Sequence, residues 1–571
     1  MDLSEIQKTG IWQLFEKGQA YLRMRNVYRD TDRNEQFYNG DQWEGAKLGD
    51  VEPLQLNFIK PIIKYKLGVI HDNLYTMVFS SMNFGDTLFR QETDRYCKIM
   101  NRYAERVWEQ TSMDQKGRQI TRDAAVNDEG VLYVDFDKEH NMPVCEVIDK
   151  TDIYYGNENS DDIQSQPYIL IRKRMPVSAA REKAEEWGVS QEDMLLILGD
   201  NDTQEQAGEA AKWEVNDQTT VIYKLYKKDK TVRFSAATKF CQLVEDVDMG
   251  IHRYPVEHFI WETKKGSSRG EGECRRLIPN QIEVNKTLMR RALTVRQQAY
   301  PKTVADRAKI EKEEDLRKVG GVIWTTGQTV DDVRKVVSTI PPAQMSPDVA
   351  QLQQDLIQIS RELAGAGDIA TGSVNPEDAS GKAILAVKAA ADAPVTEQRE
   401  GYKYFIEGVG RIWLEYLIVH SAEGVEMEQE IKDPKTGETV ITMVQVPQSA
   451  LEALRAQVRV DVSPKGVYDR FAQEKTIENL LINGYFSPQK MNELEIYYKV
   501  LPDDAVAPKK MIGEALEYMK EEQRKIAQIQ ADANLLQQQF NLAMAEMPEM
   551  GGMPMGQSPM GQEQMPGPQV A

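Results

Sequence analysis

The chain has 571 residues, enough for more than one domain, because a single hydrophobic core rarely grows beyond about 250–300 residues. Its 28% charged and 41% hydrophobic residues are typical of a soluble protein, and the sequence shows neither an apolar run of about 18 residues, as a membrane span requires, nor a signal peptide at its start. The formal net charge of −20 argues against tight, sequence-specific DNA binding, which depends on neutralising phosphates, but it suits a surface along which DNA slides.

Up to about residue 130 the sequence predicts mainly helices. An amphipathic helix is expected over residues 11–29, followed by a charged turn at 30–34 and a second turn at Asn39-Gly40-Asp41, between aromatic residues. The segment 53–61 is expected to lead into a helical stretch that runs through Gly68, and a further helix is expected from Glu92 to Gln110.

From Gly130 onward the hydrophobic period changes to that of strands. Strands are predicted at 131–136, 143–148, 168–173 and 220–226, with a helix at 178–187 and an acidic linker at 199–212. Two later strands, 425–431 and 439–446, flank a turn-forming segment and are expected to pair as a β-hairpin. The predicted fold class is therefore mixed α/β, predominantly helical, with one α/β region split by a helical insertion.

The insertion is predicted to hold two long helices, at 273–300 and 348–364, separated by a small insert. The apolar residues of the second helix fall on one stripe, formed by Leu352, Leu356, Ile359 and Leu363. A loop at 365–381 follows, and a third long helix is expected to open at Lys382.

Basic residues gather around the first of these helices. Between Lys264 and Lys302, ten lysines and arginines face three glutamates, a local charge of 10 − 3 = +7. The candidates on the helix are Arg275, Arg276, Lys286, Arg290, Arg291 and Arg296. The sequence leaves two interpretations open: a solvated face that pairs with nearby acids, or a basic face turned toward DNA or toward acidic neighbouring subunits of a ring.

The loop at 365–381 is longer than the roughly 2–8 residues that usually connect two helices, and it contains four glycines. One interpretation is a flexible surface connection. The other is a loop that touches a DNA backbone without reading its sequence. The candidate contacts are Thr371, Ser373 and Asn375, with Lys382 and Lys388 at the start of the next helix.

No motif predicts catalysis or a bound cofactor. Gly381-Lys382 lacks the earlier glycine and the following Ser or Thr of a P-loop, and Arg275 stands where a dinucleotide fingerprint needs its third glycine. The four cysteines are scattered and predicted to be buried thiols, and the five histidines form no zinc-binding pattern. The sequence therefore predicts a protein that is not an enzyme and has neither a metal nor a cofactor.

The C-terminal region changes character. A strict seven-residue spacing of apolar positions joins Ile512, Met519, Ile526, Ala533 and Phe540. Such a helix packs either against copies of itself or a neighbour, or as a solvated helix with one stripe on its own domain. Residues 546–571, rich in Met, Gly, Pro and Gln, are predicted to be disordered.

The order of these features resembles that of the portal proteins of tailed double-stranded-DNA bacteriophages. The resemblance covers about residues 30–500. Its cues are Tyr-Asn-Gly-Asp-Gln-Trp (38–43), Leu-Asn-Phe-Ile-Lys-Pro (56–61), residues 255–285 with Gln281 and Asn285, and Asp-Ala-Ser-Gly-Lys-Ala-Ile (378–384). None of these is a catalytic signature, so the resemblance depends on their order.

The resemblance implies the portal fold, with an α/β wing, a two-helix stem, a small α/β clip, a long helix behind a tunnel loop, and a helical crown. In this sequence the wing would take residues 1–262 and 423–504, the stem 263–300 and 347–366, the clip 301–346, the tunnel loop 367–381, the long helix 382–422, the crown 505–545 and the disordered tail 546–571.

The resemblance also implies a function. The family forms a ring, usually of twelve subunits, at one vertex of the virion capsid, assembled in the host cytoplasm, as a conduit for DNA packaging and ejection. The implied partners are double-stranded DNA, the terminase large subunit, a head–tail adaptor protein, and the major capsid and scaffolding proteins, with no membrane. Two alternatives are a non-channel scaffold protein of the virion and a DNA-packaging enzyme.

Overall fold

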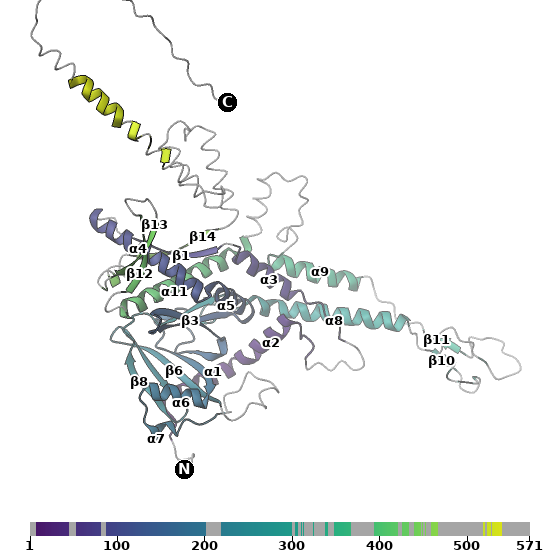
Figure 1. Cartoon of the computed structure of the whole chain (residues 1–571). Helices are drawn as coiled ribbons and strands as arrows, with labels where there is room; N and C mark the ends of the chain where they lie inside the picture. Colours follow the sequence, from purple (N-terminus) through teal and green to yellow (C-terminus); the bar gives the residue numbers. More distant parts are fainter. Residues whose placement is uncertain are drawn as a thin grey trace, which may run out of the picture. The chain divides into compact units, whose positions relative to one another are not determined.

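A computed structural model gives the fold of the chain (Figure 1). The described residues are 7–44, 53–72, 74–81, 87–200, 218–299, 303–305, 310, 312, 314, 324, 337–340, 348–366, 393–420, 425–432, 439–446, 448, 451–452, 458–465, 518–519, 522, 524–526 and 528–539. The chain divides into two compact units, residues 1–465 and 466–571. All the helices and strands named below belong to the first unit.

Two helices open the chain. α1 (Gly10–Met24) and α2 (Val27–Asn39) are separated at Asn26, which has a left-handed backbone conformation with φ of 57°. The charged turn predicted at 30–34 is wrong, because these residues lie inside α2, where an aspartate in the first turn interacts favourably with the helix dipole. The turn predicted at Gly40 is confirmed: this residue ends α2 with φ of 107°, a conformation that favours glycine.

Three more helices complete the N-terminal helical region. α3 (Ile59–Ile70) and α4 (Thr87–Gln110) confirm the two helices predicted there. α5 (Met113–Asn127) packs closely on a later helix, since a Cβ atom at Gly117 would overlap the hydroxyl group of Tyr402. This glycine permits the close approach of the two helices.

Two antiparallel sheets follow, a three-stranded sheet in the order β3–β2–β9 and a five-stranded sheet in the order β4–β5–β6–β7–β8. Their strands are β2 (Glu129–Asp137), β3 (Met142–Ile148), β4 (Ile153–Tyr155), β5 (Tyr168–Pro176), β6 (Gln218–Lys228), β7 (Thr231–Ala237), β8 (Gln242–Asp248) and β9 (Val256–Ile260). The four strands predicted before residue 230 are confirmed as β2, β3, β5 and β6. α6 (Val177–Glu186), with the short α7 (Gln191–Met194) after it, confirms the predicted helix, and most of the predicted linker lies outside the described residues.

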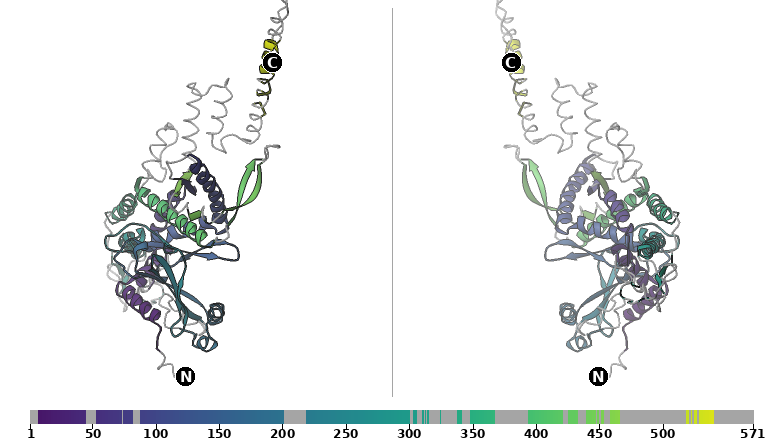
Figure 2. Two further views of the ribbon diagram at one scale, coloured as in Figure 1. Left: turned by 90° about the vertical axis from the view of Figure 1, so that its left-hand side faces the viewer. Right: turned by 90° about the vertical axis from the view of Figure 1, so that its right-hand side faces the viewer.

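One strand pair and the contact of a hairpin with α4 join the parts of the chain on either side of the insertion. β1 (Leu74–Ser81) pairs antiparallel with β14 (Val458–Lys465). β12 (Val425–Lys432) pairs antiparallel with β13 (Thr439–Val446), which confirms the predicted hairpin. Figure 2 shows this hairpin as a two-stranded ribbon, and β12 contacts α4. Segments before and after the insertion therefore share one unit.

The helical insertion is confirmed in its two long helices, α8 (Glu273–Ala299) and α9 (Asp348–Leu363). Between them, β10 (Thr303–Ala305) and β11 (Val337–Thr339) pair antiparallel, and most of the predicted clip lies outside the described residues. The third helix, α11 (Thr396–His420), follows a 3-10 turn at 393–395. Of the long helix predicted over 382–422, residues 396–420 form α11 and residues 382–392 lie outside the described residues; Pro394 in the 3-10 turn lacks the N–H of an α-helical hydrogen bond.

The main core surrounds α11, whose residues from Phe405 to Ile418 are nearly all buried. The four cysteines are free and buried, as predicted. Among the described helices, none is long and apolar enough to cross a membrane. Within the same residues, no group of three or more His, Cys, Asp or Glu side chains is placed to hold a metal ion.

In the second unit, the described residues between 518 and 539 are helical and exposed. Three apolar side chains on this segment, Ile526, Ile529 and Leu536, are all more than half exposed. Within the described part of the chain, nothing covers this apolar stripe. The first interpretation of the seven-residue spacing, packing against another chain, fits this exposure and remains a prediction.

Candidate functional site

α8 and α9 run antiparallel and side by side (Figure 1), and two side-chain hydrogen bonds fix how they face each other. Asn280 donates from Nδ2 to Ser360 Oγ (3.0 Å), and Arg291 donates from Nη1 to Gln353 Oε1 (2.7 Å). Both acceptors are buried side chains of α9. Paired polar groups therefore make the contact between the two helices.

α9 exposes three of the four residues of its predicted apolar stripe, and the fourth, Leu356, is partly buried and packs against the main core. Leu352, Ile359 and Leu363 are 53%, 51% and 80% exposed, whereas the polar Gln353 and Ser360 are buried. On a helix of a globular domain the apolar stripe usually faces the core, so the polarity of α9 is inverted. We call Leu352, Ile359 and Leu363 the apolar row.

Four of the six basic side chains predicted on α8 lie on one exposed side of that helix. These are Arg275, Arg276, Lys286 and Arg290, which we call the basic row. At 3.6 residues per turn they fall within about a third of the helix circumference. Three of them form ion pairs: Arg275 with Asp30 (3.6 Å), Arg276 with Glu262, and Lys286 with Glu283 (2.8 Å).

The remaining two predicted basic residues do not join this row. Arg291 turns toward α9, where it bonds Gln353, and Arg296 is exposed near the end of α8 on another side of the helix. The structure thus brings together four of the six residues. The pairing with nearby acids, one of the two interpretations of the basic segment, is confirmed for three of them.

Arg269, counted in the sequence with the basic segment, is instead buried at the start of α8. Its guanidinium group makes as many hydrogen bonds as it has N–H groups. Nη1 donates to Glu129 Oε1 (2.8 Å) and to the carbonyl of Lys150 (2.9 Å), Nη2 to the carbonyl of Ile153 (2.8 Å) and to Glu158 Oε1 (2.9 Å), and Nε to Glu158 Oε2 (2.9 Å). This side chain ties the loop before α8 to the two sheets.

Further buried ion pairs surround Arg269. Lys150 pairs with Asp128, whose other oxygen accepts from the backbone N–H of Gly272 (2.7 Å). Lys66 of α3 pairs with Glu273, the first residue of α8, at 2.7 Å. The network therefore fixes the first turn of α8 against α3 and the junction of α5 with β2.

The carboxylates bonded to Arg269 have shifted pKa values. Burial raises the pKa of Glu129 to about 7, although the positive charges of Arg269 and Lys150 oppose this rise. Burial also disfavours the charged form of Glu158, but the neighbouring Arg269 outweighs it, so the pKa of Glu158 is lowered. Ionised Glu158 is thus the stronger electrostatic partner of Arg269.

The loop that carries Arg269 reads Gly-Ser-Ser-Arg-Gly-Glu-Gly at 266–272. Gly270 has φ of +69°, and a Cβ atom there would overlap the side chain of Ile260 and the carbonyl of Glu262. Gly272 lies against the backbone of α5, so it too has no room for a larger residue without movement. Glycine at both positions lets the arginine turn inward directly before α8 begins.

An extended segment, residues 53–58, runs along α8, and we call it the strap. Its alternate N–H groups bond side chains one helical turn apart: Leu54 N–H to Met289 Sδ (3.2 Å), Leu56 N–H to Asn285 Oδ1 (3.3 Å) and Phe58 N–H to Gln281 Oε1 (3.1 Å). The spacings match because four helical residues rise about 6 Å and two extended residues about 6.6 Å.

The strap explains why three of the sequence cues occur together. Asn285 donates to Gln42 Oε1 (2.5 Å), and Asn57 donates to the carbonyls of Phe37 and Tyr38 (3.3 and 3.0 Å). The cues at 38–43 and 56–61 therefore meet Gln281 and Asn285 on one side of α8. Their role in this chain is to hold the helix in place.

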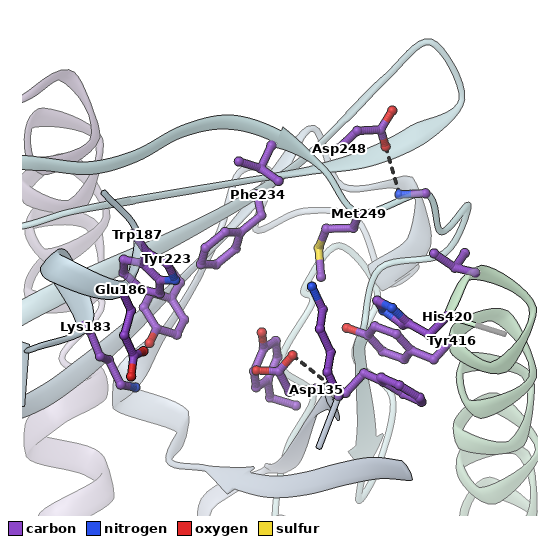
Figure 3. A pocket seen from close by; sticks show the side chains of 16 residues that line it. Asp135, Lys183, Glu186, Trp187, Tyr223, Phe234, Asp248, Met249, Tyr416 and His420 are labelled. Carbon is purple, nitrogen blue, oxygen red and sulfur yellow. Dashed lines mark hydrogen bonds between the residues drawn. The ribbon is translucent and has the colours of Figure 1, made fainter. Parts of the chain in front are cut away.

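A cleft of about 520 Å³ lies between the five-stranded sheet and the C-terminal end of α11 (Figure 3). In one wall the ring of His420 stacks on that of Phe136, with ring centres 4.3 Å apart. In the other wall Tyr223 packs edge-on against Phe234, with ring centres 5.2 Å apart. Its charged residues have both signs: Asp135, Lys138, Lys183, Glu186 and Asp248. The walls are aromatic, and the mixed charges favour no particular ligand.

The described residues on either side of the segment that contains the predicted tunnel loop lie close together. Gly365, two residues after the end of α9, has φ of +70° and lies so close to Pro394, before α11, that a Cβ atom would overlap the proline ring. The N–H groups of Gly365 and Ala366 bond the carbonyls of Glu362 and Arg361, which closes the helix end. The candidate DNA contacts, Thr371, Ser373, Asn375, Lys382 and Lys388, lie outside the described residues.

One buried carboxylate predicts a pH-dependent stability. Glu257 of β9 lies against Gly408 of α11, its Oε2 atom has no hydrogen-bond partner among the described residues, and burial raises its pKa to about 7. Below about pH 4.5 the group is protonated in both folded and unfolded chains, so it has no effect. As the pH rises toward 7 the unfolded chain ionises more readily, and stability is lost.

We therefore expect Glu257→Gln to stabilise the chain by about 3 kcal/mol at pH 8 and by almost nothing at pH 4.5, at about 1.4 kcal/mol per unit of pKa change. Urea unfolding at the two pH values measures the difference. Glu245→Gln, at an exposed position of β8, is the control and should change neither value. Equal effects of Glu257→Gln at both pH values would contradict the assignment.

A family model described as phage P22-like portal protein matches residues 184–553, well over half of the chain. Among curated proteins, none matches the chain significantly. The matched range contains α8, α9, α11 and the β12–β13 hairpin, and it begins after the strap.

Proposed function

The chain belongs to the family of phage P22-like portal proteins, and on that premise we propose that its copies close into a dodecameric ring that forms the conduit for DNA at one capsid vertex. The family is one of structural proteins, so we assign the chain no reaction. The helical insertion and the loop at its end supply the parts of the channel.

The inverted polarity of α9 carries the ring proposal. Fully burying an aliphatic side chain contributes roughly 1.5–3 kcal/mol, and the chain alone leaves most of this unrealised in its apolar row. A neighbouring copy supplies the missing surface, and cyclic symmetry closes such contacts without leaving a free end. Trp324, Val304 and Ile340 of the proposed clip are exposed as well, as expected of a segment that neighbours complete.

We propose that double-stranded DNA passes through this ring without sequence recognition. The tunnel loop (367–381) would touch the DNA backbone through Thr371, Ser373 and Asn375, with Lys382 and Lys388 close by. The contact of Gly365 with Pro394 supports this role, because the chain leaves and re-enters the described fold at one place on either side of the segment that contains the loop. The net charge of −20 favours weak contacts, which sliding requires.

The proposed partners follow the segments of the chain. The clip (301–346) would bind the terminase large subunit during packaging and the head–tail adaptor afterwards. The wing (1–262 and 423–504) and the crown (505–545) would face the major capsid and scaffolding proteins inside the virion. Assembly would take place in the host cytoplasm.

The ring proposal predicts that Ile359→Asp with Leu363→Asp abolishes assembly. Each substitution places a carboxylate in an interface that assembly would bury, at a cost of several kcal/mol. We expect rings of the unchanged chain, and only protomers of the variant, at micromolar concentration. Native mass spectrometry and negative-stain images distinguish the two.

The matched control is Gln351→Asp with Gln354→Asp, which adds the same two charges at exposed positions outside the apolar row of α9. Rings should form with this variant. A monodisperse monomer of the unchanged chain at physiological salt would contradict the ring, and rings of the Ile359→Asp, Leu363→Asp variant would show that α9 does not hold it together.

A further inference from the structure

The apolar row and the basic row lie on the same side of the α8–α9 pair. The bonds from Asn280 to Ser360 and from Arg291 to Gln353 define the line of contact between the antiparallel helices. On α8 the basic row lies about a quarter turn from this line, and on α9 the apolar row also lies about a quarter turn from it. In an antiparallel pair of right-handed helices, both displacements lead to one face. We call this the stem face.

The other flank of α8 carries the strap. Gln281 and Asn285, which hold the strap, lie about a third of a turn or more from the centre of the basic row, and Met289 lies about a quarter of a turn from it. The strap presents its own apolar surface, since Leu54 and Leu56 are 42% and 46% exposed. Asp41 and Glu44, exposed acids of the adjoining segment, stand near it.

The two flanks are complementary in character. The stem face combines leucine-type side chains with arginines and a lysine, and the strap side combines two leucines with two acids. Interfaces commonly place apolar contacts at the centre and opposite charges around them, where the charges set the register. A head-to-tail ring needs this kind of pair, because its contacts join two different surfaces of the same chain.

We infer that the stem face of one copy seats on the strap of the next copy. The inference rests on the proposed ring and names its contact surfaces. It also assigns a role to Arg290, the one member of the basic row without an ion pair among the described residues: Arg290 pairs with acids of a neighbouring subunit. Duplex DNA would satisfy the arginines but would leave the adjacent apolar row without a partner, since phosphates offer no apolar surface.

A disulfide cross-link tests this contact in the assembled full-length protein. The double variant Leu56→Cys, Ile359→Cys puts one new thiol on each surface, and the four native cysteines are buried and do not compete. After mild oxidation we expect a ladder of covalent oligomers on a denaturing, non-reducing gel, and dithiothreitol should remove it. The matched control is Leu56→Cys, Gln354→Cys, because Gln354 is exposed on the opposite flank of α9; it should give no ladder.

The outcomes separate this inference from the ring itself. Rings of the Leu56→Cys, Ile359→Cys variant that give no ladder overturn the stem-face contact and leave the ring intact. Absence of rings from the unchanged chain overturns the proposed function. Arg290→Glu supplies a second measurement: we expect impaired assembly, partly restored by Asp41→Lys. Normal rings of Arg290→Glu that have lost DNA retention would assign the basic row to DNA and overturn the inference.

Discussion

Replacing Arg269 with alanine should destabilise the chain by about 3–5 kcal/mol, the largest effect that we expect of any single substitution. The change removes a buried guanidinium group and leaves Glu129 and Glu158 without their principal partner. Two backbone carbonyls lose donors as well. Because Glu129 has a pKa of about 7 and takes up a proton readily, the loss should be smaller at pH 5 than at pH 8.

Urea unfolding at fixed protein concentration measures this loss. Arg275→Ala is the matched control, because Arg275 lies six residues further along, is exposed, and pairs with Asp30 at 3.6 Å; such a pair is worth about 1 kcal/mol or less. Arg269→Lys should fall between the two, since lysine keeps the charge but loses the planar fork. Equal effects of Arg269→Ala and Arg275→Ala would show that the buried network does not fix the start of α8.

The sequence predicts the long helices of the insertion well, and for physical reasons. A proline directly after 300 and Ser-Pro before Asp348 mark helix boundaries locally, and α8 and α9 agree with the predictions to within about a residue. The 3-10 turn before α11 was the exception. Pro394 is a residue that usually marks a helix boundary. The residues around it nevertheless continue a helical pattern, and the prediction followed that pattern.

The polarity of α9 could not be predicted. Periodicity identifies a stripe at Leu352, Leu356, Ile359 and Leu363, but it does not predict that only Leu356 packs against the core while the other three side chains stay exposed. Which side of α9 is covered depends on the rotation of α9 about its own axis relative to α8. Two hydrogen bonds between polar side chains set this rotation, and each joins residues more than 60 positions apart in the sequence. Composition likewise counted Arg269 as a surface charge. The glycines on both sides of it were the available sign that this arginine sits in a tight loop.

The strap shows a different limit. The cues at 38–43 and 56–61 and the residues Gln281 and Asn285 stand out in the sequence, yet more than 200 residues separate the first two from the last two. No local pattern predicts that an extended segment will bond one side of a helix so far away. Their contact can be seen only in the folded structure, and it gives these sequence cues a structural role, which is to hold the strap on α8.

The chain on either side of the segment that contains the tunnel loop makes the loop's proposed function separable from folding. Gly365 and Pro394 touch, so the chain between them leaves and returns at one point, and its length enters the closing entropy only weakly. Changes in the middle of the loop should therefore leave the contact of Gly365 with Pro394, the stem helices and the ring unaffected. A loop of this kind can be altered without unfolding the protein that carries it.

Replacing Val374-Asn375-Pro376 with three glycines should leave ring assembly intact and strongly reduce the packaging or retention of DNA. A single exposed contact is worth about 1 kcal/mol or less, but every copy in the ring loses its contact at once, so the combined loss is several kcal/mol. A packaging assay with the cognate capsid and terminase, scored by the fraction of filled heads, measures it. The control places three glycines at Gln204-Glu205-Gln206, in the predicted linker, which has no proposed DNA contact. Heads that fill and hold DNA normally with the altered loop would leave 367–381 as a connection only. The contact between DNA and the ring would then have to be made by a segment other than the tunnel loop.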